Sequence, residues 1–351
     1  TCAGRRIIRG VAPGPPKYFR KDETMTPKTE AELADIIATA DAPLAISGGG
    51  TRGFSAEGAP LSVSGLSGIE LYEPGALTIV AKAGTRMSEI EAALAKENQR
   101  LPFEPMDHRA LLGTDGEPTI GGVIAANVSG PRRIQSGAAR DYMLGVRFVD
   151  GAGTVLKNGG RVMKNVTGYD LVKLMTGSYG TLGVLSEVAL KVLPRTDVVA
   201  SIMIDGLSDA EAVRAMSDAL GSPFEVSGAA HMPRGPEEKP VTMIRIEGFE
   251  GSVKYRSGKL ADLLAGYGAA RVETDPEKTD AMWTGIRDVA PFHGVGGDVW
   301  RVSCKPSDGP QLSAALSATD TLFDWGGGLI WALTPEGTDA RASLGAYDGH
   351  A

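Results

Sequence analysis

The stretch of sequence that decides the fold is Pro118–Leu193, which reads PTIGGVIAANVSGPRRIQSGAARDYMLGVRFVDGAGTVLKNGGRVMKNVTGYDLVKLMTGSYGTLGVLSEVALKVL. Glycines recur inside otherwise apolar, strand-like runs, where they cost stability. A chain accepts that cost where its backbone passes close to a ligand or takes a positive φ. A second glycine cluster lies upstream at Ser47–Gly50. Bare backbone over such a length suggests a large, flat, polyanionic cofactor.

The composition is that of an ordinary globular protein. The chain has 351 residues, which favours about two domains. The hydrophobic share of 42% and the charged share of 23% are ordinary, whereas 47 glycines are unusually many. These glycines are not periodic, which excludes collagen. The net charge of −7 argues against nucleic acid or anionic lipid as the main partner.

Cysteine and histidine are too sparse for a metal centre. Cys2 and Cys304 are too few for an iron–sulfur cluster, a cysteine-rich zinc site or a disulfide framework, which fits a reducing compartment. The four histidines, at 108, 231, 293 and 350, include no pair spaced i, i+4. We therefore expect no metal. No apolar run approaches 18 residues, so no transmembrane helix is expected.

Changes in composition and in residue pattern divide the sequence into an N-terminal extension and two domains. Residues 1–24 are rich in arginine and lysine, lack a signal-peptide pattern, and are expected to form an upstream extension. The glycine-rich domain then covers 25–195, and a more regular domain covers 196–335. In this second domain the pattern predicts strands near 197–204, 224–230, 241–248, 269–273 and 298–303. It also predicts a helix that begins at a capping box at Ser208, and further helices over 252–265 and over 277–288. This alternation favours a two-layer α+β domain with antiparallel strands.

Local signals also place elements in the first domain. A capping box at Thr29–Glu32 predicts a helix over 29–40, and Thr85 is expected to cap a second helix. Short strands are predicted at 43–46, 61–64, 77–83 and 185–193. The turn Asp150–Gly153 predicts a hairpin between strands 142–149 and 154–157. Asp170 is expected to cap a short helix at 171–175.

The first glycine loop has three readings. Gly48, Gly50 and Gly53 satisfy the Rossmann pattern G-x-G-x-x-G. That fold needs a helix directly after the glycines, but residues 54–60 read FSAEGAP and Leu61–Ser64 alternates like a strand. A glycine nest, whose successive N–H groups bind phosphate without a helix, fits better. A tight surface turn is the alternative if the loop is considered alone.

Five segments carry a family resemblance: ISGGG at 46–50, TIGG at 119–122, SGPRR at 129–133, GGRVMKNVTGYD at 159–170 and GTLGV at 180–184. They resemble the FAD-binding domain of the vanillyl-alcohol oxidase / p-cresol methylhydroxylase (PCMH) superfamily. Within it, the chain is most similar to the FAD-binding subunits of bacterial glycolate oxidases. The likeness is good over 25–195 and loose over 195–335. It implies an α+β fold, in which a two-lobed PCMH-type FAD-binding domain precedes a smaller, antiparallel, ferredoxin-like cap domain.

The resemblance implies a cofactor, FAD, and residues that bind it. The loop Ser47, Gly48, Gly49, Gly50 and Thr51 would take the diphosphate with backbone donors; Thr119, Gly121 and Gly122 would lie along the cofactor, where a Cβ at either glycine would collide; Asn127, Ser129 and Arg132 would approach the isoalloxazine edge; Gly183 and Val184 would supply backbone contacts. For the TIGG segment alone, a glycine-lined barrel corner is the alternative.

The sequence favours FAD that is not covalently bound. Some superfamily members attach the flavin to His or Cys, but Arg52–Phe54 offers no nucleophile. His108 is the nearest candidate, and a role as a turn residue or as a polar residue of the flavin site suits it better.

A substrate site is harder to read. An α-hydroxy acid needs a cation for its carboxylate and a base for its hydroxyl proton. Arg301 is a candidate cation and His293 a candidate base, although a solvated arginine and a loop histidine are the ordinary readings. Related enzymes carry paired metal-binding histidines in their second half, and this sequence has none. That favours a flavin-carrying subunit within a complex.

The resemblance implies partners: a homologous FAD-bearing subunit and an iron–sulfur subunit. We therefore expect an FAD-dependent oxidoreductase subunit that oxidises glycolate to glyoxylate and passes electrons to the iron–sulfur partner. A stand-alone FAD-dependent 2-hydroxy acid dehydrogenase of the D-lactate type is the first alternative, and a non-catalytic assembly subunit that keeps the fold is the second. The expected location is cytoplasmic, or peripheral at the inner membrane through partners. Residues 336–351 are expected to begin a C-terminal segment shorter than the Phe-Asp-Pro…Asn-Pro-Gly-Arg segment with which the family usually closes.

Overall fold

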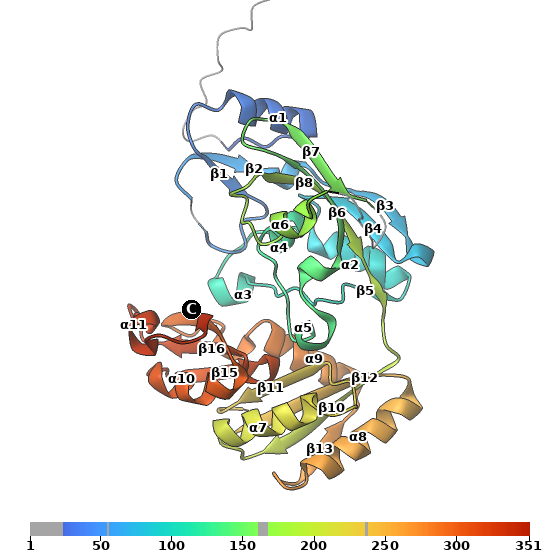
Figure 1. Ribbon diagram of the computed structural model, residues 1–351, viewed down its shortest axis with the longest axis vertical. Coiled ribbons are helices and arrows are strands. Elements are labelled where there is room, and N and C mark those ends of the chain that lie inside the picture. The colour runs from blue at the N-terminus through green and yellow to red at the C-terminus, as the bar shows by residue number, and fades with distance from the viewer. Residues whose placement is uncertain (1–23, 55, 161–167, 236–237) are drawn as a thin grey trace, which may run out of the picture.

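The computed structural model describes residues 24–54, 56–160, 168–235 and 238–351. They form an N-terminal domain and a cap domain, stacked end to end along the long axis in Figure 1. The segment SGPRR and α5 (Arg133–Ser136) reach from the N-terminal domain down to the cap domain. The two domains are joined near residue 195, directly after β9 (Leu193–Pro194).

The first lobe of the N-terminal domain is small. It contains α1 (Glu30–Thr39) and two parallel strands, β1 (Leu44–Ser47) and β2 (Ala59–Ser62). Helix α1 begins as its sequence predicts, because the Thr29 hydroxyl accepts a hydrogen bond from the Glu32 N–H. Glu30 forms an ion pair with Arg147 and so ties this lobe to the second one.

The second lobe is a five-stranded antiparallel sheet in the order β3-β4-β8-β6-β7. The strands are β3 (Ile69–Glu73), β4 (Thr78–Lys82), β6 (Met143–Val149), β7 (Val155–Gly159) and β8 (Val184–Lys191). The hairpin of β6 and β7 forms as predicted, with the Asp150 carboxylate accepting from the N–H groups of Ala152 and Thr154. Helices α2 (Met87–Lys96), α3 (Arg109–Leu112), α4 (Ile120–Ala125) and α6 (Leu171–Met175) accompany this sheet.

Two local predictions need correction. The TIGG run is not strand-like: Ile120–Ala125 is helical, because the Thr119 hydroxyl caps it by accepting from the Gly122 N–H. Thr85 does not cap α2. Its hydroxyl bonds to the carbonyl of Lys82 instead, and Arg86 stands at the cap position without a side-chain bond. Asp170 does cap α6, by accepting from the Lys173 N–H.

The cap domain begins as a ferredoxin-like unit. Its first four strands, β10 (Val198–Asp205), β11 (Gly228–Met232), β12 (Val241–Gly248) and β13 (Ala270–Glu273), lie in the order β13-β10-β12-β11. Helices α7 (Asp209–Leu220) and α8 (Glu250–Leu264) connect them, and α9 (Pro276–Arg287) follows. The capping box at Ser208 forms, since Ser208 and Glu211 bond to each other's backbone N–H groups.

The sheet then continues beyond that unit. Strands β15 (Asp320–Asp324), β16 (Leu329–Thr334), β14 (Asp298–Cys304) and β17 (Gly349–His350) extend it to eight strands. Helices α10 (Gly309–Ala315) and α11 (Ala340–Leu344) pack beside this extension. The pair β5 (Gln99–Arg100) and β9 lies at the linker. Among the described residues, no helix is long and apolar enough to cross a bilayer.

Candidate functional site

A cavity of about 360 Å³ opens in the N-terminal domain. The loop after β1 lines one side of it, from Ile46 to Phe54. The start of α4 and the segments around Gly180 and Leu185 line the rest. Both glycine clusters singled out in the sequence therefore meet at one place, although about 70 residues separate them.

The loop after β1 presents unpaired backbone donors. The N–H groups of Gly49, Gly50 and Thr51 have no hydrogen-bond partner among the described residues. The loop is held through its carbonyls instead: Ser62 Oγ donates to the Gly48 oxygen at 3.3 Å, and Thr114 Oγ1 donates to the Thr51 oxygen at 2.9 Å. Such a row of free amides is the arrangement that binds phosphate oxygens.

The start of α4 plays a different part. The Gly121 N–H is already bonded to the Ala83 carbonyl at 2.7 Å. A Cβ on Gly121 would stand 2.7 Å from both the oxygen and the Cβ of Ala83, so this glycine is required by the chain's own packing. A Cβ on Gly122 would meet no atom closer than the Thr119 hydroxyl, at 3.3 Å. Gly122 thus contributes open surface, and Gly121 lets α4 approach β4.

Charged and aromatic groups complete the wall. Arg52 lies over the rings of Phe54 and Tyr179, at 5.2 and 5.8 Å, and its Nη1 is buried without a partner. Burial and the charge of Arg52 lower the pKa of His108 to about 4, so the imidazole is neutral at pH 7. Tyr179 and Phe54 contact edge to face. Arg52, which follows the glycine loop directly, is a cavity residue that was not among the predicted site residues.

The structure brings most of the predicted cofactor residues together. Ser47, Gly48, Gly49, Gly50, Thr51, Thr119, Gly121, Gly122 and Val184 all line the cavity. Gly183, Asn127, Ser129 and Arg132 do not. A Cβ on Gly183 would stand 2.8 Å from the Val149 carbonyl, so close packing on β6 requires that glycine.

The Asn127 and Ser129 side chains are occupied elsewhere. Asn127 Oδ1 accepts from the backbone N–H of Arg140, and Ser129 Oγ accepts from the backbone N–H of Ala139. Their neighbours Ala126 and Val128 line the cavity instead. The segment therefore passes along the cavity, and these two polar side chains hold the backbone of Ala139 and Arg140 instead.

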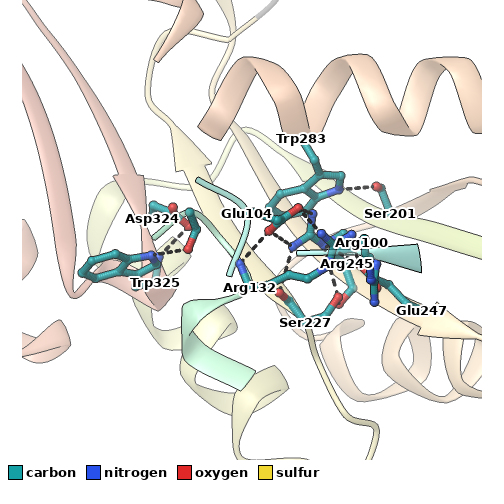
Figure 2. Close-up of polar contacts among 11 residues, drawn as sticks. Arg100, Glu104, Arg132, Ser201, Ser227, Arg245, Glu247, Trp283, Asp324 and Trp325 are labelled. Atoms are coloured by element: carbon teal, nitrogen blue, oxygen red, sulfur yellow. Dashed lines mark hydrogen bonds and ion pairs between the residues drawn. The ribbon is translucent and has the colours of Figure 1, made fainter. Parts of the chain in front are cut away.

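Arg132 belongs to a buried ion network between the domains (Figure 2). It binds Glu104 of the first domain at 2.5 Å and Glu247 of the cap at 2.7 Å. Arg245 binds the same two carboxylates, and Arg100 binds Glu247 at 2.8 Å. All of these groups except Glu247 line a second cavity of about 420 Å³ between α2, the linker and α9.

The two catalytic candidates, Arg301 and His293, contact different residues. Arg301 stands over the rings of Trp325 and Trp331, at 5.1 and 5.8 Å, and its guanidinium has no acid partner among the described side chains. His293 Nε2 bonds to the carbonyl of Asp288, inside its own loop, and His293 lines neither cavity. Within the described ranges, no three His, Cys, Asp or Glu side chains gather as metal ligands would. Residues 161–167, from the predicted signature segment, lie outside the described residues.

Comparisons with known proteins agree on a family. A family model described as an FAD binding domain matches residues 22–159. Glycolate oxidase subunit GlcE of Escherichia coli is 39% identical over 293 residues, which is 82% of this chain and 75% of that protein. A D-lactate dehydrogenase of Anaerostipes hadrus is 31% identical over 42% of this chain and 29% of its own length.

Solved structures show the same fold. A crystal structure of alkyldihydroxyacetonephosphate synthase superposes with a TM-score of 0.69 at 18% identity, over 92% of this chain and 70% of that one. The described cavity fits FAD, because it combines free amides suited to a diphosphate with a largely apolar wall and the unpartnered Nη1 of Arg52. FAD is thus the cofactor of this fold, and the chain belongs to the glycolate oxidase subunit GlcE family of FAD-linked, PCMH-type oxidoreductases.

Proposed function

We propose that this chain is the FAD-carrying subunit of a glycolate oxidase complex, which oxidises glycolate to glyoxylate and passes the electrons to an iron–sulfur subunit. The likeness to GlcE over most of both chains supports this most directly. Glycolate oxidase subunit GlcD of Bacillus subtilis, 39% identical over 85 residues, supports a second, homologous FAD-bearing subunit. The two cysteines are too few for an iron–sulfur cluster, so in this proposal the electrons pass to a partner rather than directly to a quinone. We propose a cytoplasmic location, or a peripheral one through partners.

FAD supplies a two-electron acceptor, and the chain supplies its binding and environment. We propose that the free N–H groups of Gly49, Gly50 and Thr51 bind the diphosphate, and that Gly122 and Val184 line the bound cofactor. The cofactor is held without a covalent bond in this proposal. The neutral His108 and the cationic Arg52 then provide the polar contacts at the cavity wall.

The rival function is a stand-alone 2-hydroxy acid dehydrogenase of the D-lactate type. The likeness to D-lactate dehydrogenases of Anaerostipes hadrus and Archaeoglobus fulgidus favours it, but these matches cover 42% and 51% of this chain. The match to GlcE covers 82% of this chain and has the higher identity. The complex is therefore the better supported reading.

The deciding experiment compares the purified chain with its reconstituted complex. The chain alone should be yellow, with flavin absorbance near ~370 and ~450 nm, and should not turn over glycolate or D-lactate with an artificial acceptor. Adding the partner subunits should restore glycolate oxidation. Turnover by the isolated chain would support the stand-alone enzyme. A protein that stays colourless after FAD is added would support the assembly subunit.

A further inference from the structure

Three arginines of the described chain are half-buried yet have no hydrogen bond or ion pair to their guanidinium groups: Arg52, Arg133 and Arg301. Other described arginines that are half-buried or buried, such as Arg132 and Arg245, bind carboxylates. An unpaired, desolvated guanidinium is costly. Three such groups in one chain call for an explanation.

Two of the three arginines share one aromatic ring. Arg133 from α5 and Arg301 from β14 stand over the same ring, that of Trp325, at 4.4 and 5.1 Å. The charges of Arg133 and Arg52 both lower the pKa of Arg301, after the larger effect of burial. Arg52 lies over the ring of Tyr179, and Tyr179 is among the groups that act electrostatically on Arg301. Arg133 and Arg301, from two distant segments, thus direct positive charge to one ring at the domain junction, and Arg52 adds to the positive charge that acts on Arg301.

The acids near this ring do not neutralise the positive charge. Asp324 influences Arg301, but it is 2% exposed and already accepts the Trp325 N–H at 2.7 Å. Asp141 influences Arg133, and it accepts the N–H of Ala138. Neither carboxylate forms an ion pair with the three guanidinium groups. Within the described part of the chain, the two guanidinium groups over Trp325 therefore have no anionic partner.

The ring of Trp325 fixes the geometry. Its Nε1 donates to the Gly130 carbonyl across the domain junction at 3.1 Å, so its orientation is set by both domains. Each guanidinium that lies over this ring is restrained, which suits planar, two-point recognition of a carboxylate. Arg52 lines the cofactor cavity, whereas Arg133 and Arg301 do not.

We propose that Arg133 and Arg301, held on the ring of Trp325, bind the carboxylate of a small 2-hydroxy acid at the end of the FAD cavity. This rests on the proposed function, since it names the substrate site of that reaction. Arg52 extends the positive charge from this site to the cofactor. In this arrangement Arg132, the neighbour of Arg133, holds the domains together and Arg133 binds the ligand.

The test is a titration of the FAD-loaded chain with oxalate, a planar dicarboxylate that resembles a 2-hydroxy acid, followed by flavin absorbance and calorimetry. Arg133→Gln and Arg301→Gln should each weaken oxalate binding at least tenfold and leave FAD affinity within about threefold. Arg271→Gln is the matched control, because Arg271 forms an exposed pair with Asp205. It should change neither affinity.

Three results would overturn the proposal. The first is that the wild-type chain binds no oxalate, and the second is that both variants bind oxalate as tightly as the wild type does. The third is that the variants lose FAD and keep oxalate, which would assign the arginines to the cofactor. If either glutamine variant unfolds, Arg133→Lys and Arg301→Lys take its place in the same titration, because lysine keeps the charge and loses the two-point geometry. Oxalate binding through these arginines in a chain whose complex does not oxidise glycolate would keep this site and reject the proposed function.

Discussion

Arg245 of the cap domain and Glu104 of the FAD-binding domain face each other in two parallel hydrogen bonds, Nη1 to Oε1 and Nη2 to Oε2, each 2.9 Å long. Arg245 is 1% exposed. Burial alone would raise the pKa of Glu104, but the charges of Arg245 and Arg132 outweigh it and hold that pKa below its usual value. The pair is therefore ionised at neutral pH, and it fixes the cap against the flavin domain.

Glu104→Ala should lower the free energy of unfolding by about 3–5 kcal/mol, because it leaves two buried arginines short of a counter-charge. Urea unfolding at pH 7.5 measures this. The control is Glu70→Ala, since Glu70 pairs with Lys82 on the surface and should cost less than about 1 kcal/mol. Similar small losses in both variants would mean that the network is solvated and does not hold the domains together.

Gly49→Ala should abolish FAD binding. A Cβ at this position would stand 1.5 Å from the Glu117 carbonyl oxygen, so the loop must move and its free amides with it. The loss is measured as the dissociation constant of FAD, from quenching of flavin fluorescence. Gly75→Ala is the matched control, because its Cβ would meet nothing within 4 Å, and it should bind FAD like the wild type.

Gly122→Ala separates the cofactor from the packing. Its Cβ would meet only the Thr119 hydroxyl, at 3.3 Å, and alanine favours a helix by up to about 1 kcal/mol over glycine. The variant should therefore be as stable as the wild type and bind FAD at least tenfold more weakly. Gly121→Ala should instead lose stability, because its Cβ strikes Ala83. Normal FAD affinity in Gly122→Ala would mean that the cofactor does not pass this residue.

The elements that the sequence predicted best are those with local signals. The capping box at Ser208 and the cap at Thr29 need partners only three residues away, and both helices start where these residues predict. Strands β15 and β16 were not anticipated. Trp325, Gly326 and Gly327 between them all have positive φ, which reads as loop, and the strands pair with β11 and β14, far away in sequence.

The same distinction holds for the site. The loop Ser47–Thr51 and the segment Thr119–Gly122 could be chosen from the sequence, because bare backbone leaves its mark as glycine. The roles of arginines could not. Arg132 and Arg133 are adjacent and chemically identical, and what separates them is Glu247, which lies 115 residues from Arg132 and meets it only in the folded chain.

His108 should make stability depend on pH in the acid range. Its pKa is lowered to about 4 in the folded protein, against about 6.5 in the unfolded chain. Between these values the unfolded chain binds more protons, so stability falls as the pH falls through this window. From pH 7.5 to 5, the wild type should lose about 2 kcal/mol more than His108→Asn, measured by urea unfolding. Equal losses would mean that His108 is charged in the folded protein.

Asp324 should change the pH dependence of stability in the direction opposite to that of His108. Burial raises its pKa to about 7, against the effects of the Trp325 N–H and the charge of Arg245. Between about pH 4 and 7 the folded protein binds more protons than the unfolded chain, so this group's contribution falls as the pH rises and stays lost above pH 7. Asp324→Asn keeps an oxygen that accepts from the Trp325 N–H and carries no charge.

The free energy of unfolding of Asp324→Asn should therefore exceed that of the wild type by about 1–3 kcal/mol at pH 8, and the difference should shrink towards pH 4. Asp205→Asn, at an exposed pair with Arg271, is the control and should show little difference at either pH. A variant that is less stable than the wild type at pH 8 would mean that the ionised Asp324 stabilises the folded protein and that Arg245 and Arg301 depend on its charge. In that case Arg301 would already have its counter-ion, and the carboxylate site beside Trp325 would lose the argument on which it stands.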